Sequence, residues 1–234
     1  ISDSIQGIVN LGTGEITGLY CVSIQNNCIN NDGTITVTGA NSNNTGVLLK
    51  HTNSGIISEL VAINTGVVAE VSGTTSGSIE SITATNSGLI LRAYGDQSGM
   101  TYSDINANIA TQLFDLTNSV SLTIDDIQGT SIDSILLANS ADLLQISNMD
   151  VFDTHSVLLA MNVVTSGSVS ISDTTVSGYS QTFSFSGGGD FTLDETTFQA
   201  NGKVGQLSSS SALSIDGGEW SGVSGGLYTQ HSSL

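Results

Sequence analysis

Short apolar segments return at a nearly constant interval along most of the chain. The central residue of each segment lies between polar residues, as Ile171 lies between Ser170 and Ser172, and this alternation is the period of two expected of β-strands. The intervals between successive central residues are 22, 22, 23, 22, 22, 25, 22 and 22. The central residues are Ile35, Ile57, Ile79, Tyr102, Ile124, Ile146, Ile171, Leu193 and Ile215. Such a regular interval predicts a β-rich fold built from internal repeats.

Two neighbouring positions keep the same phase and grow together in size along the chain. Two residues before the central residues stand Gly33, Gly55, Gly77, Met100, Leu122, Leu144, Val169, Phe191 and Leu213. Five residues after them stand Ala40, Ala62, Ala84, Ala107, Gly129, Val151, Val176, Phe198 and Trp220. This growth indicates a packed core whose cross-section changes along its length.

A second apolar strand follows each central residue after a polar turn. Examples are "GVLL" at 46–49, "GLIL" at 88–91 and "SILL" at 134–137, and the residues between are mostly Gly, Asn, Ser, Thr and Asp. One unit of strand, turn, strand and turn cannot bury its apolar side alone, whereas stacked units form a continuous core. The sequence therefore predicts an all-β fold, a parallel β-helix or β-solenoid of about nine to ten coils of roughly 22 residues.

The repeats "SVSISDTTVSG" (168–178) and "DFTLDETTFQANG" (190–202) resemble the pectin-lyase-like, right-handed parallel β-helix superfamily. The resemblance covers residues 31–234 and implies right-handed coils. Residues 1–30 are less regular, although "GEITGL" at 14–19 fits one more strand. We therefore expect one or two irregular coils over 1–30 and regular coils over 31–234.

The chain is acidic and poor in charge. Charged residues make up 10% of the sequence, and the net charge is −18 because 21 acidic residues face only Lys50, Arg92 and Lys203. This balance excludes nucleic-acid binding, which requires many Lys and Arg contacts with phosphates, and disfavours anionic membranes. No apolar run approaches the roughly 20 residues of a membrane span, so no membrane insertion is expected.

Several features favour a secreted or cell-surface protein. The chain begins at Ile1 without a signal-like segment, which is typical of a mature form or an excised piece. Cys21 and Cys28 form either a local disulfide, which suits a secreted protein, or two unpaired thiols. A zinc site is not favoured, because no His or other Cys lies near them in the sequence. Asn43 lies in "NNT", the only N-glycosylation sequon.

Acidic residues gather one and two positions after the central residues. In a stacked fold they would form a ridge of carboxylates at ~5 Å intervals, which either holds Ca²⁺ or forms a solvated polar corner. The calcium candidates are Asp104, Asp125, Asp126, Asp194 and Glu195. No other cofactor is expected.

The resemblance raises the possibility of a pectin-cleaving enzyme, which the residues do not favour. Lyases of that type use a basic residue beside calcium-binding acids, but no acidic cluster surrounds Arg92 in the sequence. Hydrolases group Asp residues; Asp125 and Asp126 are adjacent, with Asp104 one coil away, yet neighbouring residues of a strand point to opposite faces. The accompanying His and Gly motifs are missing, so we expect no catalytic activity.

The ends of the predicted solenoid suggest a structural role. No amphipathic helix is present to cap them, and Trp220 falls near the core of the last coil. Either the ends stack on further coils, of the same chain or of another copy, or Trp220 and the tail "TQHSSL" form a cap. The sequence favours a structural rod in an extracellular filament, surface appendage or adhesin.

Two alternatives stay open. The outward position before each central residue includes Thr34, Thr101, Thr123 and Thr192, as in ice-binding solenoids, but acidic residues lie beside it. Carbohydrate binding or cleavage is the third hypothesis.

Overall fold

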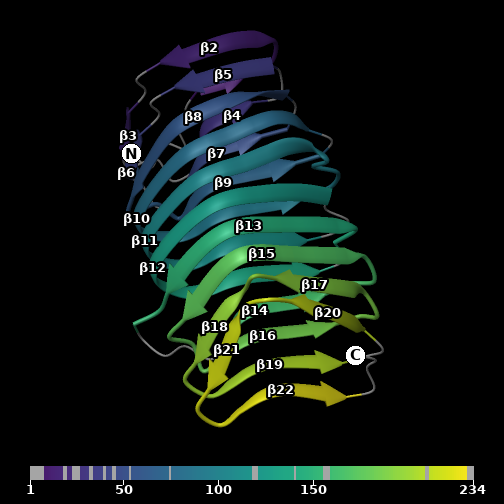
Figure 1. The fold of residues 1–234 in the computed structure, drawn as a ribbon. Helices are drawn as coiled ribbons and strands as arrows, with labels where there is room; N and C mark the ends of the chain where they lie inside the picture. The colour runs from purple at the N-terminus through teal and green to yellow at the C-terminus, as the bar shows by residue number, and fades with distance from the viewer. Residues whose placement is uncertain are drawn as a thin grey trace.

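The protein is a β-solenoid. The computed structural model describes residues 8–17, 20–22, 27–31, 34–38, 41–43, 46–52, 54–73, 75–117, 121–139, 141–154, 159–208 and 211–230. Within these residues 22 strands form one continuous parallel sheet that winds into about eight turns of roughly 22 residues, with no helix (Figure 1). The predicted fold class is confirmed, with about eight regular coils rather than nine to ten.

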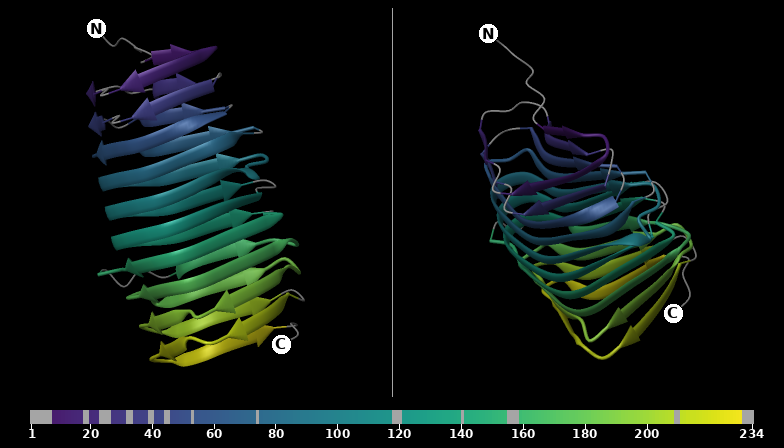
Figure 2. Two further views of the ribbon diagram at one scale, coloured as in Figure 1. Left: turned by 45° about the horizontal axis from the view of Figure 1, so that its top comes forward. Right: turned by 90° about the horizontal axis from the view of Figure 1, so that it is seen from above.

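The strands follow one another in chain order along the stack, and the first and last described coils lie at its opposite ends (Figure 2). They are β1 (Ile8–Asn10), β2 (Thr13–Thr17), β3 (Tyr20–Val22), β4 (Asn27–Asn31), β5 (Thr34–Thr38), β6 (Asn41–Asn43), β7 (Val47–His51), β8 (Ser54–Ile63), β9 (Val67–Ser72), β10 (Ser76–Tyr94), β11 (Gly99–Thr117), β12 (Ser121–Asn139), β13 (Leu143–Phe152), β14 (Leu159–Val164), β15 (Ser168–Ser177), β16 (Gln181–Ser186), β17 (Asp190–Asp194), β18 (Thr197–Ala200), β19 (Lys203–Ser208), β20 (Ala212–Asp216), β21 (Glu219–Gly222) and β22 (Gly225–Gln230).

Each coil consists of straight stretches joined by bends, and β10 shows the design. Its chain bends at Ser81 and Asn86, both of which have left-handed backbone angles (φ 54° and 50°). A single left-handed residue turns the strand without interrupting its ladder, and it places two successive side chains on the outside. Between the bends the alternation resumes, with Ile82 and Ala84 buried and Thr83 exposed. One coil therefore presents three faces, separated by two bends and a turn.

The register confirms the predicted repeat from Ile57 to Ile215. Every central residue from Ile57 onward is paired in register with the next one along the stack. The prediction is wrong at the first repeat, where Val37 rather than Ile35 is opposite Ile57. Ile16 of β2 is in turn opposite Val37, so the first two intervals of this ladder are 21 and 20 residues.

One of the two predicted inward columns grows in residue size along the stack, whereas the other does not at its start, because Ile35 rather than the predicted Gly33 is opposite Gly55. The residues five positions after the central residues pair with one another along the stack. Of this predicted series, Ala62 is the first described member and Trp220 is the last. Its next earlier partner is Ser42, whereas the predicted Ala40 lies outside the described residues. Between these ends the ladder runs through Ala84, Ala107, Gly129, Val151, Val176 and Phe198.

Aromatic rings fill the core near the C-terminal end of the stack. The ring of Phe185 is stacked between Phe183 and Phe191, with 4.5 Å between centroids on each side. Phe183 also lies 5.9 Å from Phe198 and 5.7 Å from Trp220. Offset and edge contacts of this kind add to the free energy of burial, so aromatic packing contributes to the stability of the last three coils.

A buried polar network closes one corner near the middle of the stack. Gln97 is fully buried; its amide nitrogen donates to the carbonyl oxygens of Gly73 (2.8 Å) and Tyr94 (3.2 Å). Its amide oxygen accepts from the hydroxyls of Thr75 and Tyr102, the latter at 3.1 Å. One side chain thus satisfies polar groups from two successive coils, and burial raises the pKa of the Tyr102 phenol far above its usual value.

Candidate functional site

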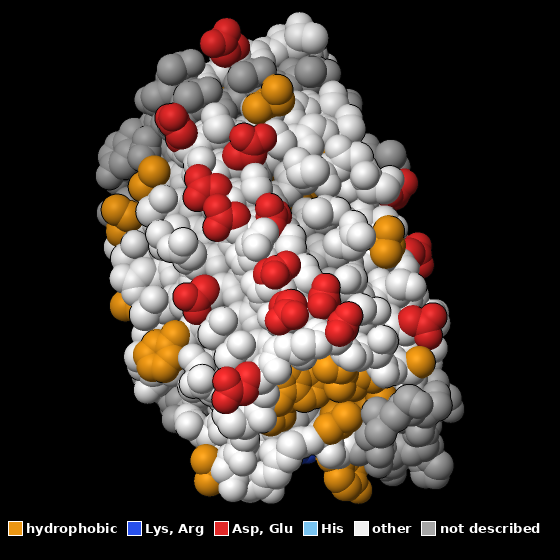
Figure 3. Space-filling model, in the orientation of Figure 1, with side chains coloured by type: hydrophobic (Ala, Val, Ile, Leu, Met, Phe, Trp, Pro, Cys, Tyr) orange, Lys and Arg blue, Asp and Glu red, His pale blue; other side chains and the backbone are white. Residues whose placement is uncertain are grey.

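The acidic ridge predicted from the sequence follows the first bend of each coil. Left-handed residues occupy that bend in seven described coils: Glu59, Ser81, Asp104, Asp126, Asn148, Asp173 and Glu195. The ladder position just before the bend adds Glu80, Asp125, Asp194 and Asp216. In Figure 3 the acidic side chains form an oblique band across the face of the rod, with almost no basic side chain on that face.

Both Asp125 and Asp126 reach the outside, contrary to the expectation that they point to opposite faces. The left-handed conformation of Asp126 (φ 53°) interrupts the strand alternation at this point. Asp125 accepts hydrogen bonds from Ser147 (2.6 Å) and Asn148 (2.8 Å) of the next coil. These hydrogen bonds, Ser147 first, hold the pKa of the Asp125 carboxyl below its usual value.

Hydroxyl and amide groups separate several carboxylates along the ridge. Ser81 donates to Asp104 (2.6 Å) in the next coil along the chain, whereas Ser147 and Asn148 donate to Asp125 in the preceding coil. Across the part of the chain that the structure describes, no group of three or more His, Cys, Asp or Glu residues is arranged to hold a metal ion. Calcium binding by Asp104, Asp125, Asp126, Asp194 or Glu195 therefore stays a prediction without a preformed ligand set.

The basic residue considered for catalysis is engaged on another face. Arg92 lies beyond the second bend of β10, where its guanidinium contacts Glu70 (3.5 Å) and Asp115 (3.3 Å). Lys50 contacts Glu70 from the other side (3.6 Å), so basic and acidic side chains alternate over four successive coils. The structure does not bring Arg92 together with Asp104, Asp125 and Asp126. This charge ladder was not predicted, although its members recur at intervals of 20, 22 and 23 residues.

Other predicted site residues lie outside the described side chains. Cys21 falls in β3 and Cys28 in β4, and Asn43 is the last residue of β6, but the structure describes only their backbone. The disulfide and the glycosylation site stay predictions. β2 and β3, within the predicted irregular region 1–30, and β4, which extends one residue beyond it, pair with β5, β6 and β7 in the common ladder.

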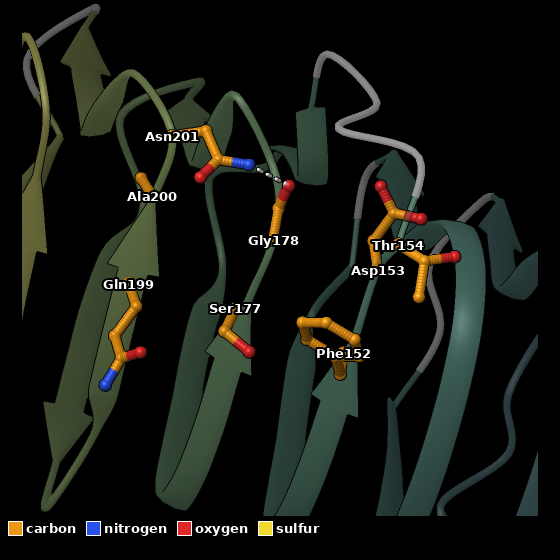
Figure 4. Close-up of a pocket in the computed structure, with 8 residues that line it drawn as sticks. All are labelled: Phe152, Asp153, Thr154, Ser177, Gly178, Gln199, Ala200 and Asn201. Atoms are coloured by element: carbon orange, nitrogen blue, oxygen red, sulfur yellow. Dashed lines mark hydrogen bonds between the residues drawn. The ribbon is translucent and has the colours of Figure 1, made fainter.

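A groove of about 490 Å³ crosses the second bend of three coils (Figure 4). Phe152, Ser177 and Gln199 are ladder partners whose side chains stand side by side along it. The corner above them is lined by Asp153, Thr154, Gly178, Ala200 and Asn201. The groove was not predicted from the sequence.

Close backbone packing shapes this groove. Gly178 has a φ of 94°, and a Cβ atom there would overlap the carbonyl oxygen of Asp153, so only glycine fits. Asn201 donates from its side-chain nitrogen to the carbonyl of Gly178 (2.7 Å), which fixes the rim. Three additional residues enter the chain just after this corner, because Leu136 pairs with Met161 at an interval of 25.

The groove combines an apolar ring with uncharged polar groups. Phe152 is 47% exposed, whereas Asp153, the only carboxylate among the lining residues, is 2% exposed. Glycoside hydrolysis generally requires two carboxylates flanking the bond, and the lining residues do not provide that pair. The lining residues therefore offer one exposed aromatic ring and uncharged hydrogen-bonding groups.

The C-terminal coil leaves its core open. Ile215 continues the column of inward central residues, yet it is 46% exposed, whereas Leu193 one coil earlier is fully buried. Trp220 and Leu227 continue two other inward columns and are only partly buried against the core. We call Ile215, Trp220 and Leu227 the terminal core face; Figure 3 shows hydrophobic side chains in a hollow at this end.

Trp220 is held in place within this face. Its indole nitrogen donates to the hydroxyl of Thr196 (3.0 Å), and its ring lies 5.4 Å from Phe198. The predicted assembly residue is thus a pre-positioned aromatic side chain at the end of the rod. Within the described residues, β20, β21 and β22 each pair with one earlier strand only, so the outer edge of each presents unpaired backbone groups.

The face formed by the first stretch of each coil is nearly uncharged. Two outward columns run along it, one and three positions before the central residues, and Asp190 is their only charged residue from Ser54 onward. The column nearer the bend contains Ile56, Ser78, Thr101, Thr123, Gln145, Ser170, Thr192 and Ser214. The acidic ridge borders this face but does not interrupt it.

Comparison of the chain with protein-family models, with curated proteins and with solved structures found no match. Among the described residues none forms a helix long and apolar enough to cross a membrane.

Proposed function

We propose that the protein is a non-enzymatic extracellular rod that assembles through its ends, as part of a filament, surface appendage or adhesin. The observation that carries this proposal is the terminal core face. In every earlier regular coil, the inward residues are buried under the next coil. At this end the corresponding residues are open to solvent and lie beside unpaired strand edges. Exposed apolar surface and unpaired edges together favour association with another β-coil.

The rest of the molecule supports a mechanical role. The ladder is parallel and in register throughout the described coils, and its core is continuous from Ile29 to Leu213. The strong acidic charge keeps single rods apart sideways at low salt, so the apolar terminal core face is the more favourable contact. We also propose that the chain is a divergent, right-handed member of the pectin-lyase-like superfamily, supported by its coils of about 22 residues.

Electron microscopy and light scattering over a range of protein concentrations test the structural proposal. We expect single rods at low concentration and longer, end-joined particles as the concentration rises, with and without calcium. Single rods at every concentration would reject assembly through the ends.

Ice binding is a second candidate, favoured by the nearly uncharged face described above. An ice-binding face must hold water in a regular array, which a charged side chain disturbs. Thr101→Lys, on this face, should then abolish thermal hysteresis, whereas Thr83→Lys, exposed on the neighbouring face, should preserve it. If the unaltered protein shows no hysteresis at all, this candidate is rejected.

A further inference from the structure

One asparagine at the rim of the groove is followed directly by glycine. Asn201 and Gly202 form the only Asn-Gly pair in the sequence, and they lie between β18 and β19, outside the strands. Asparagine is a thermolabile residue, because the backbone nitrogen of the next residue can attack the carbon of its side-chain amide. Glycine favours this attack, since it has no side chain to shield its nitrogen. The rim therefore contains the dipeptide in which asparagine reacts most readily.

The backbone nitrogen of Gly202 is available for such an attack. The hydrogen bonds that tie this bend to its neighbours use other groups: the Asn201 backbone nitrogen donates to the carbonyl of Tyr179 (2.6 Å), and the Gly202 carbonyl accepts from Ser224 (3.0 Å). Among the described residues, the Gly202 N–H donates to no backbone or side-chain acceptor. Asn201 is exposed, so water reaches its side chain. The attacking nitrogen, the amide and water thus meet at the surface of one bend.

The Asn201 side chain is also a structural part of the rim. Its Nδ2 donates to the carbonyl oxygen of Gly178 in the preceding coil (2.7 Å), and this contact holds the two corners together (Figure 4). The nitrogen that makes this hydrogen bond is the atom that leaves when the side-chain amide reacts. Conversion of Asn201 therefore removes the donor that fixes the rim.

We propose that Asn201 is a site of spontaneous deamidation, and that this reaction changes the groove as the protein ages. The Gly202 nitrogen bonds to Cγ of Asn201, the bond between Cγ and Nδ2 breaks, and ammonia leaves with the proton of the Gly202 nitrogen. The product is a cyclic imide. Water then adds to either carbonyl of the imide and opens it, which yields aspartate or isoaspartate at this position. Water is the only other reactant.

Both products alter the groove. Aspartate places a carboxylate against the Gly178 carbonyl, where a donor lay, and adds negative charge to a lining whose only carboxylate is Asp153. Isoaspartate lengthens the backbone by one methylene group. The corner is closely packed, since a Cβ atom at Gly202 would overlap the carbonyl oxygen of Ser180, and a longer backbone must displace its neighbours. Either product should loosen the contact between β18, β19 and the preceding coil.

Peptide mapping by mass spectrometry of the whole protein, aged at neutral pH, follows the reaction. Asn148 is the internal control: it is exposed, and its side-chain nitrogen also donates to another coil (Asp125, 2.8 Å), but Met149 follows it within β13. We expect Asn201 to be converted at least about tenfold faster than Asn148, with isoaspartate among the products. Equal rates at the two positions, or aspartate without isoaspartate, would overturn the proposal.

The same measurement in guanidinium chloride tests the part played by the fold. If the Gly202 nitrogen is as accessible as its lack of a hydrogen bond indicates, the folded protein should convert Asn201 at no less than about a tenth of the rate of the unfolded chain. Stronger protection by the fold would contradict the assignment.

A variant tests the effect on the groove. Asn201→Asp reproduces one product from the start, and amide hydrogen exchange in β18 and β19 should be faster in it, and in the aged protein, than in fresh protein. Exchange in β10 and β11, far from this corner along the stack, should stay the same in all three samples. Unchanged exchange of β18 and β19 would show that the rim does not depend on the Asn201 donor.

Discussion

Replacing Gly205 with alanine should destabilise the C-terminal coils, although it adds only one methyl group. Gly205 of β19 is the ladder partner of Phe183 of β16, and a Cβ atom built at Gly205 overlaps the tip of the Phe183 ring. The ring cannot easily retreat, because its centroid is 4.5 Å from Phe185, 5.9 Å from Phe198 and 5.7 Å from Trp220. The aromatic packing therefore occupies the volume that any side chain at position 205 needs.

The size of the effect follows from two opposing contributions. Forcing an extra methyl group into a packed core costs about 1–3 kcal/mol, whereas alanine is better than glycine within a strand by about 0.5–1 kcal/mol. The expected net loss in the free energy of unfolding is about 1–2 kcal/mol, measured by guanidinium chloride denaturation with circular dichroism. Gly226→Ala in the neighbouring β22 is the control, since its methyl group meets no atom within 4 Å and should leave stability unchanged or slightly higher.

A double-mutant cycle tests the cause. Phe183→Leu shortens the side chain that fills the space above Gly205, so Gly205→Ala should cost little or nothing in that background. The two substitutions should then be non-additive by about 1–3 kcal/mol, as is typical of residues in contact. An equal loss in both backgrounds, or a Gly205→Ala variant as stable as Gly226→Ala, would refute the reasoning.

Four further substitutions test buried polar groups. Gln97→Leu should lower the free energy of unfolding by about 3 kcal/mol in denaturant titrations, because the hydroxyls of Thr75 and Tyr102 lose their buried acceptor; Tyr102→Phe should cost only about 1 kcal/mol. Thr182→Val should raise the melting temperature, since the buried Thr182 hydroxyl has no hydrogen-bond partner among the described residues; an unchanged or lower value would contradict this. Burial lowers the pKa of His51 from 6.5 to about 4, so the unfolded chain binds more protons between these values. The stability that depends on neutral His51 is therefore complete above pH 6.5 and is lost as the pH falls toward 4, and His51→Val should flatten this part of the pH profile measured by denaturant midpoints.

The solenoid could be predicted because every coil must bury a residue at the same ladder position. The central residues from Ile57 to Leu193 satisfy this requirement, and the spacing through Ile215 predicted the correct register for eight levels. The prediction failed at "TITVT" (34–38), where Ile35 and Val37 are both apolar and two residues apart. A shift by two keeps the same side chains inside, so the polar and apolar pattern alone cannot distinguish the two registers.

The groove could not be predicted because it depends on how the second bends of three successive coils pack against one another. Phe152 and Gln199 share a column, but Gln199 comes from a coil 47 residues later, and nothing in the repeat marks either as functional. The opening forms where Gly178 packs against the Asp153 carbonyl and where one coil carries three additional residues. Unlike the groove, the charge ladder of Lys50, Glu70 and Arg92 could have been predicted. Its members are spaced by about one repeat in the sequence, so a search for charged residues at the repeat interval would have found it.

The acidic ridge shows how one backbone requirement can imitate a ligand site. The first bend of each coil needs a left-handed residue, and Asp, Asn and Gly adopt that conformation more readily than most residues. Asp104, Asp126, Asn148 and Gly217 meet this requirement at successive or nearby levels, and only the first two carry charge. A conformational need therefore accounts for Asp104, Asp126 and Asp173 without a metal, but not for Glu80, Asp125, Asp194 and Asp216, which lie one position before the bend. Glu195 does not fit this explanation, since glutamate has no such preference, and a test for calcium would begin with that position and its neighbour Asp194.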